Sequence, residues 1–176
     1  NKDIAQVEFN PVRAKRLLDE AGFVDPDGDG PQKRFTLSYK TSTNKERVAI
    51  ARSIAAQLEL IGIGVDVQTF EWGKFYGDVK SGNFQLYSLT WVGVTSPDIL
   101  YSVYHSSQLP PNGVNRGRYT NTAVDKQVEI ARTNPARVTR LEAYKKAQKF
   151  VLEELPVIPL WYEDNIVVYR NNLEGV

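Results

Sequence analysis

The feature that most constrains this chain is a regular alternation of strand-like and helix-like segments over almost its whole length. The strand-like segments are short, apolar and bounded by turn residues, whereas the helix-like segments repeat apolar residues every three or four positions. Strand character is predicted for residues 35–41, 64–70, 84–92, 157–162 and 166–169. Helix character is predicted for about residues 11–21, 44–61, 73–80, 99–104, 123–132 and 136–153. This alternation predicts one α/β domain over residues 1–176, with a mixed, mostly buried sheet flanked by helices.

Capping residues mark several of the predicted helix starts. Asn10 can cap a helix that begins at Pro11, where the missing amide of proline costs nothing. Thr43 followed by Glu46 resembles a capping box for the second helix. Asp98 is expected to cap the short helix over residues 99–104.

A ligand site is expected just beyond the segment FQLYSLTWV, residues 84–92. This segment is apolar on both faces, which predicts a strand inside the sheet. Ligands of α/β folds bind beyond the carboxyl ends of strands, so the residues from Gly93 onward are the first candidates. Trp72 directly follows one predicted strand and Trp91 lies at the end of another, so both can line one rim. The alternative is that both tryptophans belong to the core.

Composition excludes several kinds of chemistry. The chain has no cysteine and one histidine, His105, which removes thiol nucleophiles, disulfides and the usual Cys/His zinc sites. A net charge of +1 predicts no general attraction to nucleic acid or anionic membranes. No catalytic or nucleotide-binding motif is present, and His105 is expected at the surface or at a helix end. An enzyme would have to use Glu71 or Asp98, the carboxylates nearest the predicted site.

The segment VDPDGDGPQ, residues 24–32, reads like the first half of a calcium loop. Asp25, Asp27 and Asp29 alternate before Gly30, but the twelfth position of such a loop is Thr36 where a glutamate is required. The sequence therefore favours a structural turn, and the three aspartates remain weak candidates for a cation site.

A long loop over residues 106–121 offers further polar side chains. Loops of this length in compact domains are usually functional or mobile. Its candidate ligand contacts are Asn115, Arg116, Arg118 and Tyr119. The alternative is a solvated loop that is only anchored on the domain.

The order of motifs along the chain resembles a known family. NPVRAKRLLDEAGF, DPDGDG, FTLSYKT, ERVAIARSIAAQLELIGIGVDVQTFEWGKF, GNFQLYSLTWVG, SPDILYSVYHS, RYTNTAVDKQVEIAR and RLEAYKKAQKFVLEELPVIPLWY follow one another. This succession is similar to the C-terminal lobe of family 5 extracellular solute-binding proteins, the dipeptide and oligopeptide receptors of ABC importers. The resemblance covers nearly all 176 residues.

The resemblance implies a three-layer lobe of the type II periplasmic-binding-protein kind. Two such lobes close on a peptide or similar small solute and deliver it to a membrane permease, without catalysis or a cofactor. It also implies a periplasmic or extracellular location, with a lipid anchor at the missing N-terminus as one alternative. The chain starts at Asn1 and contains no methionine, so we expect a fragment that lacks the N-terminal lobe.

Residue by residue, the resemblance implies a pocket lined by Trp72 and Trp91. Peptide receptors of the family commonly carry an aspartate three residues after the second tryptophan, where it pairs with the peptide ammonium group; here that position is Val94. An arginine three residues before this tryptophan is replaced by Ser88. Capture of a free amino terminus by the usual route is therefore in question, because a buried ammonium needs acceptors. Asp98 is a possible substitute, and a sugar or other small solute is the alternative ligand.

Overall fold

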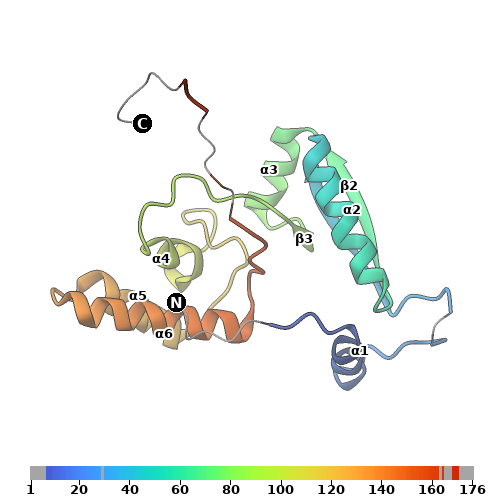
Figure 1. The fold of residues 1–176 in the computed structure, drawn as a ribbon, viewed down its shortest axis with the longest axis horizontal. Coiled ribbons are helices and arrows are strands. Elements are labelled where there is room, and N and C mark those ends of the chain that lie inside the picture. The colour runs from blue at the N-terminus through green and yellow to red at the C-terminus, as the bar shows by residue number, and fades with distance from the viewer. Residues whose placement is uncertain (1–6, 29, 163, 165–167, 171–176) are drawn as a thin grey trace.

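The computed structural model of this chain describes residues 7–28, 30–162, 164 and 168–170. Helices and parallel strands alternate in its first half, and helices dominate its second half (Figure 1). The elements are α1 (Pro11–Glu20), β1 (Phe35–Ser42), α2 (Lys45–Glu59), β2 (Ile63–Phe70), α3 (Trp72–Ser81), β3 (Leu86–Tyr87), α4 (Ile99–Tyr104), the 3-10 helix η1 (Ser106–Gln108), α5 (Thr122–Thr133) and α6 (Arg137–Glu154).

The described strands form one parallel sheet in the order β2-β1-β3. β1 and β2 pair along their whole length, from Phe35 opposite Ile63 to Ser42 opposite Phe70. Helices α2 and α3 both pack against these two strands (Figure 1). The α/β class with helices beside a sheet is therefore confirmed. A mixed sheet is not seen among the described strands, which are all parallel.

The segment 84–92 differs most from its prediction. Only Leu86 and Tyr87 form a strand, paired with Tyr39 and Lys40, so β1 and not β3 is the central strand. Trp91 is 41% exposed. Apolar residues on both faces favour burial, but a strand also needs a backbone partner on its flank, and in the described part of the chain only β1 supplies one.

A buried ion pair fixes α3 to the central strand. The ammonium of Lys40 lies 2.9 Å from Oδ2 of Asp78, and both residues are buried. Lys74 and Asn83 donate to Oδ1 of the same carboxylate, at 2.5 and 3.3 Å. Hydrogen bonds from Lys74 and then Lys40 lower the pKa of Asp78 to about 2. The contacts hold α3, and thereby Trp72 at its first position, against the sheet.

The helix starts confirm one predicted cap and correct another. The side chain of Asn10 accepts from the backbone N–H of Arg13 at 2.9 Å and caps α1, as predicted. The cap of α2 is Asn44, whose side chain accepts from the N–H of Arg47 at 3.1 Å. The prediction of Thr43 at this position was wrong by one residue. Asparagine is at least as good an N-cap as threonine, and only the backbone geometry decides between neighbours.

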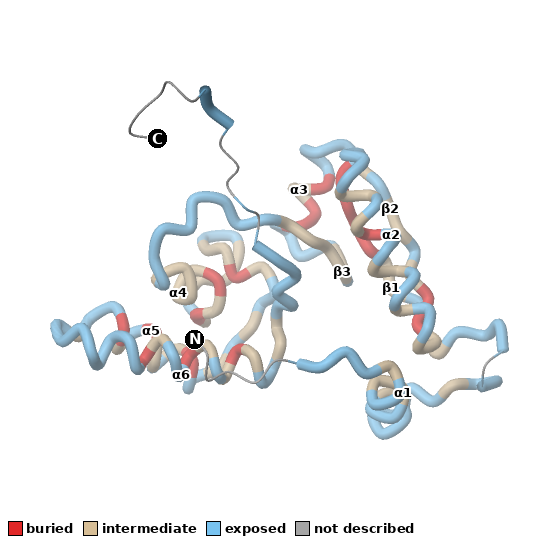
Figure 2. Tube along the Cα trace, viewed as in Figure 1, coloured by how far each residue is buried: buried red, intermediate tan, exposed pale blue. Residues whose placement is uncertain are grey.

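Helices α4, α5 and α6 pack together as a second group of elements (Figure 1). Their buried core appears as red segments along α5 and α6 in Figure 2. The core residues are Val124, Val128, Ala147 and Val151, with Leu100, Tyr101, Tyr104, Tyr119 and Phe150 packed against them. Valine and alanine at a spacing of four residues place this stripe on one face of each helix. No helix in the described ranges is long and apolar enough to cross a membrane.

Arg34 joins the first helix to the sheet. Its side chain is only 3% exposed. It donates to the carbonyls of Phe23 at 2.6 Å and Ile61 at 3.0 Å, and it also bonds the carboxylate of Asp19. A further ion pair reaches Asp25 at 3.6 Å. One guanidinium thus ties α1, the acidic turn and the connection between α2 and β2, as its rigid fork of donors allows.

The acidic turn is engaged by the fold itself. Oδ1 of Asp25 accepts from the N–H of Asp27 at 3.3 Å, and Oδ2 of Asp27 accepts from the N–H of Gln32 at 3.1 Å. These side-chain to backbone bonds are typical of a turn. Asp29 lies outside the described residues. Among the described residues, no group of three or more acidic or histidine side chains is placed to hold a metal ion.

The predicted strand at residues 157–162 does not form, and its residues are all exposed. Ile158 is 70% and Tyr162 98% exposed, and in the described part of the chain no strand pairs with this segment. The predicted strand at 166–169 falls partly outside the described residues, and its described members, Val168 and Tyr169, are exposed and form no strand.

Candidate functional site

Trp72 and Trp91 are brought to one site by a continuous row of rings and guanidinium groups. Arg47 lies over Trp72 at 5.0 Å, and Trp72 stacks on Tyr76 at 5.5 Å with the rings 9° from parallel. Arg116 lies 5.1 Å from the ring of Tyr76 and 5.3 Å from the ring of Trp91. We call these five residues the arginine–aromatic ladder. Tyr76 and Arg116 therefore link the two tryptophans.

Local structure explains why the ladder forms. Glu71 caps α3 by accepting from the N–H of Gly73 at 2.7 Å, which places Trp72 at the first helical position. Tyr76 is four residues further, so both rings lie on one helix face. Trp72 is 47% exposed, so its ring borders solvent and does not belong to the core.

Arg116 reaches α3 from the long loop and makes the ladder continuous. Its Nη2 donates to the hydroxyl of Tyr76 at 2.8 Å. Arg118, two residues on, donates to the carbonyl of Ser81 at 3.4 Å. The two arginines therefore anchor the loop on α3, and only Arg116 contacts the rings.

Positive charge is not balanced at the ladder. Lys80 adds a third cation, 5.2 Å from the ring of Tyr76. Within the described residues, no ion pair joins Arg47 or Arg116 to a carboxylate, and Nη1 of Arg47 is buried without a hydrogen-bond partner. Burial raises the pKa of Tyr87, and the nearby charge of Arg116 opposes that rise. The ladder is thus an aromatic surface with an excess of cations.

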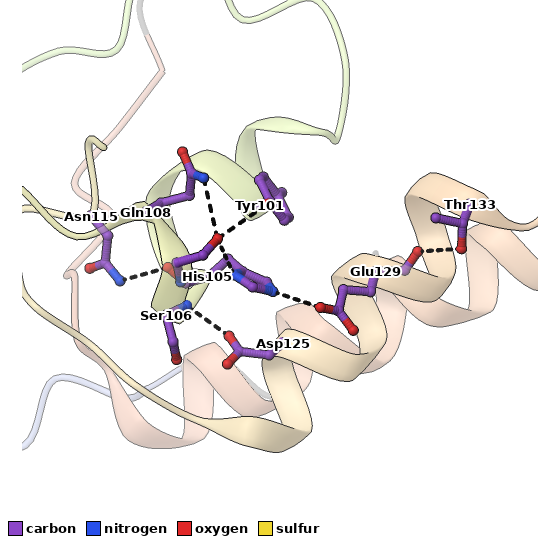
Figure 3. Close-up of polar contacts among 9 residues, drawn as sticks. Tyr101, His105, Ser106, Gln108, Asn115, Asp125, Glu129 and Thr133 are labelled. Atoms are coloured by element: carbon purple, nitrogen blue, oxygen red, sulfur yellow. Dashed lines mark hydrogen bonds and ion pairs between the residues drawn. The ribbon is translucent and has the colours of Figure 1, made fainter. Parts of the chain in front are cut away.

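Asn115 and Tyr119 hold the loop in place and are not among the five ladder residues; Figure 3 shows Asn115 directed toward His105. Asn115 is 1% exposed. Its side-chain amide donates to the carbonyls of Tyr119 at 2.7 Å and His105 at 3.3 Å and accepts from the N–H of Tyr119. The ring of Tyr119 packs edge-on against Tyr104. Burial, followed by the neighbouring carboxylate of Glu154, raises the pKa of Tyr119 to about 12. In this structure both side chains serve loop anchoring, the alternative that the sequence left open.

His105 is buried in a polar network between α4 and α5 (Figure 3). Its Nδ1 accepts from the backbone N–H of Ser107 at 3.0 Å and lies 2.8 Å from Oγ of the same serine, so the ring proton sits on Nε2, 3.1 Å from Glu129. The succession of contacts from Ser107 through His105 to Glu129 resembles a nucleophile–base–acid arrangement. The Nδ1 lone pair is already shared with a backbone N–H, so it is poorly placed to accept the serine proton. His105 ends α4, which agrees with the predicted helix-end position.

The two carboxylates proposed for an enzyme are engaged elsewhere. Glu71 caps α3. Asp98 precedes α4 but makes no side-chain capping bond, so the predicted cap was wrong. Its backbone is helical, with φ −63° and ψ −14°, whereas a capping residue typically has an extended backbone. Its Oδ1 instead pairs with Nε of Arg132 on α5 at 3.0 Å.

The remaining predicted positions lie along the segment that carries Trp91. Ser88 is half-buried and its side chain lies against the hydroxyl of Tyr39. Gly93 has a φ of 74°, which suits glycine, and Val94 is 50% exposed. Sequence reasoning did not single out Arg47 and Tyr76. The spacing of four from Trp72 to Tyr76 was the available signal for the second, whereas the contact of Arg47 depends on how α2 packs.

Two hollows elsewhere on the surface are shallow and do not include the tryptophans. One, of about 560 Å³, is lined by Tyr101, Glu129, Arg132 and Thr133. The other, of about 390 Å³, lies beside the start of α2 and is lined by Thr43, Lys45, Val48, Ala49, Arg52 and Thr69. The ladder is a solvent-exposed surface, since Trp72 is 47% and Trp91 is 41% exposed.

Comparison with known proteins finds one family. Residues 1–110 match the model described as "Bacterial extracellular solute-binding proteins, family 5 Middle". The chain is 33% identical to the oligopeptide-binding protein AppA of Bacillus subtilis over 98% of its own length and 33% of that protein. It is 31% identical to the periplasmic murein peptide-binding protein MppA of Escherichia coli over 99% of its length and 31% of that protein. The chain thus spans about a third of the length of these relatives.

Solved structures agree with the sequence matches. The structure of AppA in complex with a nonapeptide aligns with a TM-score of 0.78 over 89% of this chain and 32% of that one, at 33% identity. A periplasmic oligopeptide-binding protein of Thermotoga maritima, with bound mannohexaose, aligns with a TM-score of 0.76 over 89% of this chain and 31% of that one, at 26% identity. These similarities identify the fold as that of a periplasmic binding protein.

Proposed function

The chain belongs to the bacterial extracellular solute-binding proteins of family 5, and from this membership we propose that it is one lobe of a two-lobed receptor of an ABC importer. The receptor captures a peptide or similar small solute between its lobes and passes it to a membrane permease. The observation that carries this proposal is the arginine–aromatic ladder. It is an exposed row of rings and guanidinium groups, and such a surface suits a ligand that a closing lobe then covers.

Exposed apolar side chains support the view that the chain is one lobe of a longer receptor. Residues 157–162 carry a run of them, and an apolar patch of this kind is rarely left facing water. The run consists of Val157, Ile158, Leu160, Trp161 and Tyr162, exposed by 39, 70, 48, 58 and 98%. We propose that this segment packs against receptor sequence beyond these 176 residues, which is consistent with relatives about three times as long.

A peptide is the favoured ligand class, because AppA and MppA are named for peptide binding. A sugar or other small solute is the alternative, since the Thermotoga relative was solved with mannohexaose. Flat aromatic faces bind both sugars and peptide side chains, so the ladder alone does not select between them.

The receptor acts without catalysis and without a cofactor, outside the cytoplasmic membrane. The polar groups that an enzyme could use support this view, because Glu71, Asp98 and His105 are each committed to capping, ion-pair or turn contacts. Attachment through a lipid anchor is compatible with this location.

Calorimetry on the full-length receptor tests the proposal. Panels of short peptides and oligosaccharides are titrated into the wild type and into the Trp72→Ala and Trp91→Ala variants. Removal of a central aromatic contact typically costs about 2 kcal/mol of binding, or roughly 30-fold in Kd. Val138→Ala is the control, because Val138 is 74% exposed on α6 and is not part of the ladder. Unchanged affinity in both tryptophan variants would show that the ligand binds elsewhere.

A further inference from the structure

Arg116 is a partly buried cation without a counter-charge. Its guanidinium lies among aromatic rings, 5.1 Å from the ring centre of Tyr76 and 5.3 Å from that of Trp91. Tyr87 is also close enough for the charge of Arg116 to oppose the rise that burial causes in the pKa of its phenol. Its Nη2 donates to the neutral hydroxyl of Tyr76 at 2.8 Å, and Arg116 also makes a hydrogen bond with the hydroxyl of Tyr87. In the described part of the chain no carboxylate pairs with it.

Such an arrangement leaves binding capacity unused. A guanidinium carries five N–H donors in one plane, and the neutral hydroxyls of Tyr76 and Tyr87 take up only part of this set. Cation–π contacts offset part of the cost of removing the charge from water, but they do not supply acceptors for the remaining donors. A carboxylate can satisfy the remaining N–H donors, since it accepts two parallel hydrogen bonds from one guanidinium.

Two carboxylates belong to α3, the helix that carries Tyr76, or to its cap, and both are committed to other groups. Glu71, beside Trp72, accepts from the backbone at the start of α3, and Asp78 is paired with two lysines. Val94, three residues after Trp91, supplies no charge. The ladder and the adjoining Lys80 therefore present three cations, Arg47, Arg116 and Lys80, none of which is ion-paired with a carboxylate among the described residues.

We propose that Arg116 binds a carboxylate of the ligand, and that this receptor selects peptides or small solutes by an anionic end and not by a free ammonium group. The inference rests on the proposed function, because it requires that the ladder line the ligand cleft. Arg116 then determines specificity: its remaining N–H donors bind the carboxylate, while Trp91 and Tyr76 hold the guanidinium plane in a fixed orientation.

Pairs of peptides that differ in one charge test the inference on the full-length receptor. The peptides are N-acetylated tri- and tetrapeptides with neutral side chains. The two members of each pair share one sequence, and one has a free C-terminal carboxylate whereas the other has a C-terminal amide. We expect the acid to bind the wild type at least roughly 10-fold more tightly than the amide, and the difference to collapse in Arg116→Gln. Arg116→Lys keeps the charge but not the planar fork, so it is expected to restore only part of the preference.

Arg118→Gln is the matched control, because Arg118 ties the same loop to Ser81 without contacting the rings. It should keep the preference for the acid, and melting temperatures of all variants report whether the loop or the fold has been disturbed. Equal binding of acid and amide to the wild type, or a preference that survives in a folded Arg116→Gln, would overturn the inference. So would equal weakening of both peptides in Arg116→Gln, which would indicate that Arg116 pairs with the facing lobe.

Together with the calorimetric panels of short peptides and oligosaccharides, this experiment separates the inference from the proposed function. If only peptides with a free amino group bind, the receptor captures an ammonium, and the inference fails while the proposed function stands. If neither peptides nor oligosaccharides bind, the proposed function fails and the inference fails with it.

Discussion

Replacing Arg34 by methionine should loosen the attachment of α1 to the rest of the molecule. Methionine keeps much of the length and the apolar stem but removes every donor. The side chain of Arg34 is 3% exposed, and its loss leaves the carbonyls of Ile61 and Phe23 without this donor. Asp25, with 14% of its side chain exposed, also loses its cation.

The size of the effect follows from these contacts. An acceptor left unpaired in a partly buried site costs about 1–3 kcal/mol. Asp19 is 47% exposed and can return to water, so its contribution is small. The carbonyl of Phe23 is near solvent as well, since that residue is 50% exposed. We therefore expect a loss of about 3 kcal/mol, which for a domain of this size lowers Tm by about 6–12 °C.

Thermal unfolding of the 176-residue chain, followed by circular dichroism, measures this loss. Arg16→Met is the matched control, because Arg16 lies on α1 with 67% of its side chain exposed and forms a surface pair with Glu20. Its Tm should stay within about 2 °C of the wild type, as expected for a surface pair worth less than about 1 kcal/mol. Equal melting temperatures for the Arg34→Met and Arg16→Met variants would refute the view that Arg34 organises this end of the molecule.

Two further changes probe the contacts that position the ladder. The pKa of Asp78 in the folded state is about 2, below its ordinary value of 3.8, because Lys74 and Lys40 donate to its carboxylate. The charged carboxylate therefore stabilises the fold fully above about pH 4, and this stabilisation is lost as the pH falls through 2. Melting curves from pH 6 to 2 should show this loss of stability at low pH in the wild type and a smaller loss in the Asp78→Asn variant. Identical profiles would contradict the assignment. Asn44→Ala should cost about 1 kcal/mol of stability through the lost cap of α2, and Thr43→Ala much less; the reverse order in denaturant unfolding would restore the threonine as the cap.

The elements of the fold were predictable where side-chain periodicity alone decides them. The helix at residues 99–104 agrees with its prediction, and α5 and α6 agree within about one residue at each end. The strand at 84–92 was overpredicted, because periodicity reports burial and not the presence of a hydrogen-bonding neighbour. The exposed segment 157–162 shows the same limit, since its apolar residues have no pairing strand among the described residues.

The site was predictable only in part. The positions of Trp72 and Trp91 relative to predicted strands indicated a shared rim, and the structure joins them through Tyr76 and Arg116. The different roles of the adjacent residues Asn115 and Arg116 were not predictable, because neighbouring side chains on a loop point to different partners once the loop is folded. Asn115 faces the interior of its own loop, whereas Arg116 reaches across to α3.

The central claim is that the ladder forms one wall of a two-sided ligand cleft. Calorimetry with one peptide that binds the full-length receptor, repeated on the 176-residue chain, tests it most directly. We expect the isolated chain to remain folded and to bind at least about 100-fold more weakly, because half of the contacts and the closure of the second lobe are missing. Equal affinity of the isolated chain and the full-length receptor would contradict the account.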